Sequence, residues 1–87
     1  MYLEHNTKFY EISWIKGSIY IHYGKKPDMN VQLPFGTLKK YTFENSIKRK
    51  SFYNAKINEK LKKGYKIVKN GTGSSYDMKE MIKIKKL

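Results

Sequence analysis

Two runs of alternating apolar and polar residues, joined by only two residues, constrain the fold of this chain most strongly. The runs are KFYEISWI at 8–15 and SIYIHYGK at 18–25. Every second residue shares a face, which groups Tyr10, Ile12 and Trp14 in the first run and Ile19, Ile21 and Tyr23 in the second. A period of two is typical of strands with one buried face. Because Lys16-Gly17 is too short for a crossover, the runs are predicted to form an antiparallel hairpin with Tyr10 and Trp14 in the core.

The next segments predict one more strand and one helix. VQLPFGTLKKYTF at 31–43 has strand-forming residues on both sides of a Pro-Phe-Gly interruption, which favours an irregular or bent third strand. The stretch 45–63 has helical periodicity, with Asn45 suited to the N-cap and Gly64 suited to a left-handed position after the last turn.

The predicted helix has two distinct sectors. At 100° per residue its apolar side chains fall on one arc, which we expect to face the sheet: Ile47, Tyr53, Ile57 and Leu61. The cations fall in another sector around Phe52 and form a basic stripe: Lys48, Arg49, Lys56, Lys60 and Lys63. A solvated face is the ordinary role of such a stripe, and Phe52 is expected to cover a flank of the sheet.

The remainder of the chain completes a small α+β fold. GYKIVK at 64–69 is predicted to be extended, NGTGSS at 70–75 to be a loop, and MIKIKKL at 81–87 to be a last strand whose lysines suit a sheet edge. With 87 residues, the chain is expected to form one domain over 1–87, a twisted antiparallel sheet covered by one helix.

The charge of the chain indicates a polyanionic partner. Nineteen Lys and Arg against seven Asp and Glu give a net charge of +12. Such a field favours nucleic acid, an anionic membrane or an acidic protein. Coding bias is the alternative source of the excess, because Lys, Asn, Ile and Tyr are all abundant. The helix lacks the broad apolar face needed for shallow insertion, so membrane association is not expected.

Several chemistries are not expected from the composition. The chain has no cysteine, which excludes disulfides and thiolate chemistry, and its two histidines, His5 and His22, lack acidic neighbours at metal-ligand spacing. The carboxylates show no paired arrangement for acid and base catalysis. We therefore expect no enzyme activity, no cofactor, no metal and no small-molecule substrate. The absence of a signal-like or membrane-spanning run predicts a soluble, intracellular protein.

The landmarks of the sequence resemble those of WGR domains, the small modules of poly(ADP-ribose) polymerases and some bacterial proteins. KFYEISW at 8–14 is similar to the first strand of that family, Tyr23-Gly24-Lys25 resembles the Trp-Gly-Arg triplet, and EKLKKGY at 59–65 is similar to the signature that closes the helix. The triplet is altered, and an insertion near 27–36 is needed to keep the helix in register.

The resemblance implies a role in holding the end or break of a DNA duplex, with contacts to neighbouring domains. Tyr23 would stand where the Trp ring packs on a terminal sugar, and Lys25 where the Arg makes polar contacts. Both replacements keep the kind of contact but weaken it, because Tyr has a smaller face and Lys lacks the fork of Arg. Gly24 would let the backbone approach the ligand closely.

The sequence therefore predicts a nucleic-acid-binding protein without catalysis, with duplex DNA favoured. The predicted contact residues are Tyr23, Gly24, Lys25, Lys26, Arg49, Lys56, Lys60 and Lys63. The structural alternative makes Tyr23 the last inward residue of a strand and Lys25 a solvated charge. The functional alternative is a protein-interaction module, such as a small inhibitor or accessory subunit docking on an acidic or nucleic-acid-associated protein.

Overall fold

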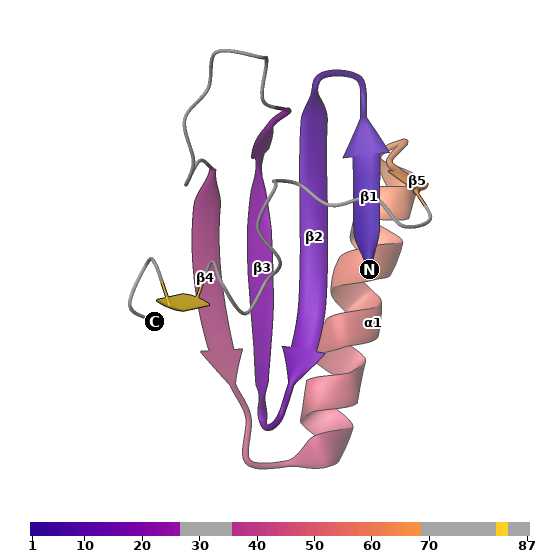
Figure 1. The fold of residues 1–87 in the computed structure, drawn as a ribbon. Coiled ribbons are helices and arrows are strands. Elements are labelled where there is room, and N and C mark those ends of the chain that lie inside the picture. Colours follow the sequence, from indigo (N-terminus) through magenta and orange to yellow (C-terminus); the bar gives the residue numbers. More distant parts are fainter. Residues whose placement is uncertain (27–35, 69–81, 84–87) are drawn as a thin grey trace.

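The predicted α+β fold is confirmed. The computed structural model describes residues 1–26, 36–68 and 82–83. Within these residues one helix, α1, accompanies an antiparallel sheet whose strand order is β4-β3-β2-β1-β5 (Figure 1). The bounds are β1 Tyr2–His5, β2 Lys8–Ile15, β3 Ser18–Lys25, β4 Thr37–Thr42, α1 Ser46–Lys62 and β5 Lys66–Ile67.

The predicted antiparallel hairpin of β2 and β3 is confirmed. Tyr10 pairs with Tyr23, and Ile12 pairs with Ile21. The turn is at Lys16-Gly17, where Lys16 adopts a φ of 56°. The central hairpin therefore follows directly from the alternation and the short connection.

The strand β1 was not predicted from the sequence. Its four residues pair with β2 through a turn at Asn6, which has a φ of 54°. Asn tolerates this left-handed conformation better than most residues. A four-residue run with no glycine in its turn carries too little periodicity to be recognised alone.

The strand β4 is shorter than the predicted third strand at 31–43. It spans Thr37–Thr42 and pairs with β3, while residues 27–35 lie outside the described part of the chain. Gly36 leads into it with a φ of 79°, and a Cβ there would lie 2.8 Å from the carbonyl oxygen of Tyr23. Only glycine fits this close approach without a shift of backbone.

Both predicted ends of the helix are confirmed. The Asn45 side chain accepts hydrogen bonds from the backbone N–H groups of Ile47 and Lys48, at 2.8 and 3.2 Å. At the other end Gly64 is left-handed, with a φ of 100°. Its N–H donates to Leu61 and that of Tyr65 donates to Lys60, which is the Schellman pattern. This cap places Tyr65 beside the last turn.

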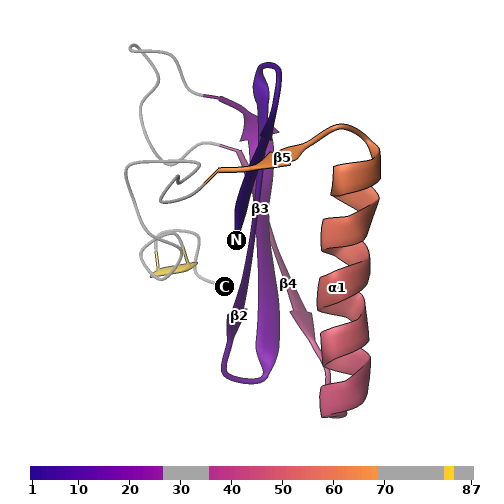
Figure 2. The ribbon, with the colours of Figure 1, turned by 90° about the vertical axis from the view of Figure 1, so that its right-hand side faces the viewer.

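The predicted buried arc of the helix is confirmed for Tyr53 and Ile57 but is wrong for its other two members. Ile57 is buried, but Ile47 is 74% exposed and Leu61 is 40% exposed. The residues of α1 that are not exposed are Arg49, Phe52, Tyr53, Lys56, Ile57 and Lys60. The helix, which stands on one side of the sheet in Figure 2, therefore turns Arg49, Lys56 and Lys60 of its basic stripe toward the sheet, while Lys48 and Lys63 stay exposed. Aromatic partners explain this rotation, because rings accept ammonium and guanidinium groups on their faces.

The core between helix and sheet is formed by residues from β1, β2, β3 and α1. Its buried members are Leu3, Tyr10, Ile12, Ile19, Ile21 and Ile57. The prediction that Tyr10 belongs to the core is confirmed. The same prediction for Trp14 is wrong, because its ring is 40% exposed near the hairpin turn and its Nε1 donates to the carbonyl of Lys16.

The predicted segments after the helix are confirmed only in part. Lys66–Ile67 forms β5 against β1, as the predicted extended segment requires. For the predicted last strand at 81–87, the two described residues, Ile82 and Lys83, have helical rather than extended geometry. The other residues of that strand and the predicted loop at 70–75 lie outside the described residues.

Candidate nucleic-acid interface

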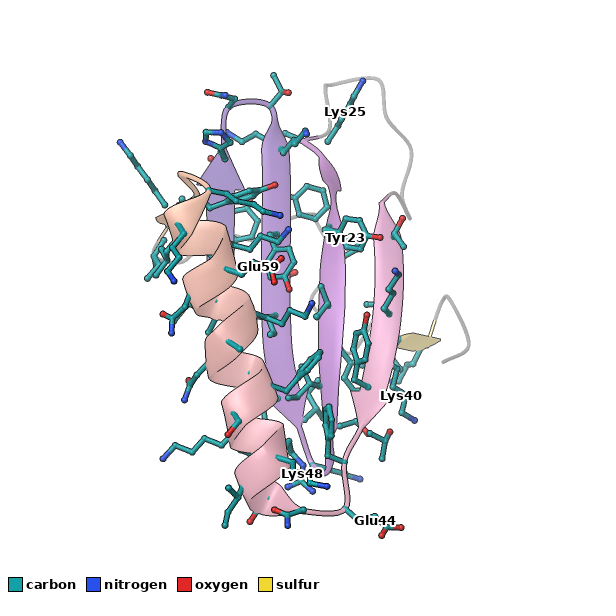
Figure 3. All side chains as sticks on the ribbon, turned by 180° about the vertical axis from the view of Figure 1, so that it is seen from behind. Tyr23, Lys25, Lys40, Glu44, Lys48 and Glu59 are labelled. Atoms are coloured by element: carbon teal, nitrogen blue, oxygen red, sulfur yellow. The ribbon has the colours of Figure 1, made fainter. Side chains whose placement is uncertain are left out.

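A basic groove runs between α1 and the face of β2, β3 and β4 that the helix partly covers. In Figure 3 the strand β4 lies clear of the helix, with Tyr23 on the open part of this face. We call this hollow the helix-side groove. It consists of an inner pocket of about 240 Å³ and an outer pocket of about 330 Å³, which share Tyr10, Tyr23 and Lys60.

The two pockets have different linings. The inner pocket is lined by Tyr10, Ile21, Tyr23, Lys39, Tyr41, Lys56, Glu59 and Lys60. The outer pocket is lined by Lys8, Phe9, Tyr10, Tyr23, Gly24, Lys25, Lys60 and Tyr65. Among the residues that the structure describes, the two linings contain five lysines and one carboxylate, which makes the groove strongly positive.

Tyr23 occupies the boundary between the two pockets. Its ring is half-buried, and its centroid lies 6.5 Å from that of Tyr10. The ammonium of Lys39 stands 5.8 Å from the Tyr23 centroid. One side of Tyr23 therefore packs inward, as expected if it is the last inward residue of its strand. The same side chain also lines both pockets of the groove.

Lys60 is the central cation of the groove. Its ammonium lies 4.8 Å from the ring centroid of Tyr10 and 5.5 Å from that of Tyr65. Partial burial, with repulsion from Lys63 and Lys56, lowers the pKa of Lys60. An anion placed in the groove would oppose both effects, because it stabilises the charged form.

Lys56 and Glu59 form the helical wall of the inner pocket. The Lys56 ammonium lies 5.5 Å from the centroid of Phe52 and 3.9 Å from the Glu59 carboxylate. Phe52 covers the flank of the sheet as predicted, with its centroid 4.8 Å from that of Tyr41 and 5.0 Å from that of Phe43. Of these three rings, Tyr41 also lines the inner pocket.

Two lysines meet at the outer end of the groove. Lys8 and Lys25 are directly opposite in the β2-β3 register, and both line the outer pocket. Figure 3 shows Lys25 at the end of its strand, beyond Tyr23. Like charges directly opposite destabilise a sheet, so a bound anion between them would be favourable.

Arg49 lies away from this groove, although it belongs to the same stripe. Its guanidinium donates to the carbonyl of Phe43 and stands 5.7 Å from the centroid of Trp14. A cation that donates to a backbone carbonyl and packs on an indole ring supports the fold. The structure therefore does not bring Arg49 together with the other predicted contact residues.

Three further predicted residues have structural contacts of their own. Lys26 forms a 2.6 Å ion pair with Glu4, and Lys63 lies 3.6 Å from Glu59 on the exposed end of the helix. A Cβ at Gly24 would lie 3.2 Å from the Cα of Gly36. The close approach at Gly24 is thus to the start of β4. Of the eight predicted residues, the groove collects Tyr23, Gly24, Lys25, Lys56 and Lys60.

Sequence reasoning missed several residues of the groove, namely Lys8, Lys39, Tyr41 and Tyr65. The alternation of TLKKYT does place Lys39 and Tyr41 on one face, but only the pairing of β4 with β3 shows which face. For Tyr65 the available signal was the glycine before it, since a left-handed cap turns the next residue back toward the helix.

The opposite face of the sheet carries a buried polar pair. His22 is fully buried, its Nδ1 lies 3.9 Å from the Glu11 carboxylate, and its ring meets the ring of Phe9 edge-on at 4.9 Å. Among residues 1–26, 36–68 and 82–83, no cluster of three or more His, Asp or Glu side chains is arranged to hold a metal ion. In the same residues no helix has the length and apolar character required to cross a membrane.

Comparisons with protein-family models, curated proteins and solved structures found no match to this chain. The similarity to WGR domains therefore remains a prediction from the short motifs of the sequence.

Proposed function

We propose that this protein binds nucleic acid without catalysis, and that the helix-side groove supplies the contact. One observation carries the proposal: five lysines from β2, β3, β4 and α1 converge with tyrosine rings on one groove, where the described part of the chain places a single carboxylate. Ammonium groups neutralise phosphates, and aromatic rings contact sugars or bases. The net charge of +12 would assist the approach of any polyanion.

Duplex DNA is the favoured polymer under the WGR resemblance. The triplet Tyr23-Gly24-Lys25 lies at the outer end of the groove, where a phosphate backbone could reach Lys8 and Lys25. Phosphate contacts position a protein but carry no sequence information, so binding should show little preference for base sequence.

A salt titration tests the proposal. Neutralisation of about five to eight phosphates predicts that log K falls with log salt at a slope of about −4 to −7 for duplex DNA. Fluorescence anisotropy of a labelled blunt duplex at several salt concentrations measures this slope. A slope near zero, or no binding at low salt, would contradict the proposal.

The protein-interaction alternative is tested in the same preparation. If the target is another protein, the partner recovered with this chain should remain bound after nuclease treatment, and the purified chain should not bind DNA. If nucleic acid is the target, nuclease treatment should release whatever co-purifies.

A further inference from the structure

The aromatic lining of the groove is not required for binding to phosphates. Lysines alone are sufficient to hold a duplex backbone, because that interaction is electrostatic and independent of sequence. The described groove nevertheless exposes Tyr23, Tyr41 and Tyr65 as half-buried rings beside the ammonium groups. A ligand that contacts these rings must itself have an apolar or aromatic surface.

The inner pocket accepts a single flat group. Its volume of about 240 Å³ is below the roughly 300–1,000 Å³ of sites that take drug-sized ligands. Tyr23 and Tyr41 come from neighbouring strands, with Ile21 between them on the sheet surface. A nucleobase is of suitable size and shape, whereas a duplex is far too wide to enter.

Base pairing would prevent such an insertion. Within a duplex the faces of the bases are stacked on one another, and only their edges are open in the grooves. A strand with unpaired bases can present a ring face to an aromatic side chain, and that contact tolerates any base. A pocket lined by tyrosine rings would therefore favour unpaired over paired nucleotides.

The surrounding polar groups suit the rest of a nucleotide strand. Lys60 borders both pockets, so it can meet a phosphate next to a base held in the inner one. Lys8 and Lys25 lie further along, in the outer pocket, where the chain of phosphates can continue. Glu59 is the one carboxylate of the lining, and it would accept a hydrogen bond from an amino group on a base edge.

We infer that the helix-side groove binds single-stranded nucleic acid, with one unpaired base in the inner pocket against Tyr23 and the neighbouring phosphates on Lys60, Lys25 and Lys8. This inference rests on the proposed nucleic-acid binding and specifies its ligand. It differs from that proposal in two respects: the bases, and not only the phosphates, supply affinity, and the preferred polymer is single-stranded instead of duplex.

The experiment compares three fluorescent DNA ligands at equal salt: a mixed-sequence single strand, an abasic strand with the same number of phosphates, and a blunt duplex of that sequence. The unmodified protein should bind the single strand about tenfold or more tightly than the abasic strand or the duplex. This preference corresponds to stacking of one base. Equal affinity for the single and abasic strands would overturn the inference.

Variants of Tyr23 test the position of the base. Tyr23→Leu should lower single-strand affinity about tenfold and leave abasic-strand affinity unchanged, whereas Tyr23→Phe should keep the preference because it keeps the ring face. Trp14→Leu is the matched control, since its exposed ring lies outside the groove. An equal loss for the single and abasic strands in Tyr23→Leu would overturn the assignment.

The outcomes separate the two proposals. Salt-dependent binding of equal strength to all three ligands would overturn the single-strand inference and leave the proposed function standing. Absence of salt-dependent binding to every ligand would overturn both. A free mononucleotide should compete only weakly, because it lacks the continuing phosphates. Full displacement of the strand by a mononucleotide at equal nucleotide concentration would instead assign the groove to a small ligand and overturn the inference.

Discussion

Arg49 and Lys60 lie on the same stripe of α1, about three turns apart, but their charges have different surroundings. Arg49 donates to the Phe43 carbonyl and stacks on Trp14, near the start of the helix. Lys60 stands over Tyr10 and Tyr65 and borders both pockets of the groove. The first cation completes the fold, and the second remains available to an anion. Cations that form one stripe in the sequence can therefore have two different roles, one in holding the fold together and one in binding a ligand.

The rotation of the helix decides which of its residues are buried. A substitution that tests this rotation has the largest expected effect on stability. Ile57→Ala should destabilise the protein by about 2–4 kcal/mol, because it removes the buried apolar anchor of α1. Ile47→Ala, on the exposed side of the same helix, should change the free energy of unfolding by less than about 0.5 kcal/mol. Urea unfolding followed by circular dichroism measures both. Equal losses would show that the helix docks differently.

A substitution of Arg49 tests whether this cation supports the fold and not the binding of DNA. Arg49→Leu should lower stability by about 1.5–3 kcal/mol, because a charged hydrogen bond to the Phe43 carbonyl is lost. DNA affinity of the folded variant should fall no more than its single lost charge explains. Lys48→Leu, at the exposed residue directly before Arg49, provides a control with the same charge change. A larger affinity loss for Arg49→Leu than for the control would place Arg49 in the interface.

Substitutions of Lys56 and Lys60 test whether the lysines of the helix-side groove bind DNA. The double variant Lys56→Gln, Lys60→Gln should reduce DNA affinity about tenfold, or about 1.4 kcal/mol, and lower the salt slope by about 1.8. Lys48→Gln with Lys50→Gln removes the same charge from exposed positions of α1. Anisotropy titrations measure the DNA affinity of the two double variants. Because their net charges are equal, any difference in affinity comes from where the lysines were removed. If both lose affinity equally, the groove has no special role.

The smallest predicted effect concerns alkaline pH and two tyrosines that pack in the core between helix and sheet. Burial raises the pKa of Tyr10 and of Tyr53 above the ordinary value of 10.0. The folded state therefore favours the protonated phenols, so their contribution to stability is complete below pH 10.0 and is lost as pH rises through the folded pKa values. Urea unfolding at several alkaline pH values should show this decline. Stability that stays constant well above pH 10.0 would contradict the burial of these rings.

The elements with strong local signals were predictable. The hairpin register follows from alternation and a two-residue turn, and the helix ends follow from Asn45 and Gly64. The short strand β1 and the shared face of Lys39 with Tyr23 were not predictable, because they depend on pairing between strands. The exposure of Trp14, which contacts Arg49 and Tyr53 of α1, likewise depends on the packing of the helix against the hairpin.

The chemistry of the candidate site was predictable from the sequence, but the set of residues that form it was not. The excess of lysine and the placement of Tyr23 near Lys25 both indicated contact with a polyanion. Neither indicated that Arg49 would bind the backbone of Phe43, or that Lys8 and Lys39 would join Lys60.

The sequence by itself determined the strands of the hairpin, the span of the helix and the positive charge, because periodicity, capping and composition act over a few residues. Only the tertiary structure decided which cations face the sheet and which of them share a groove with aromatic rings. Helix rotation and strand order depend on packing among residues far apart in the chain, and no local pattern specifies that packing.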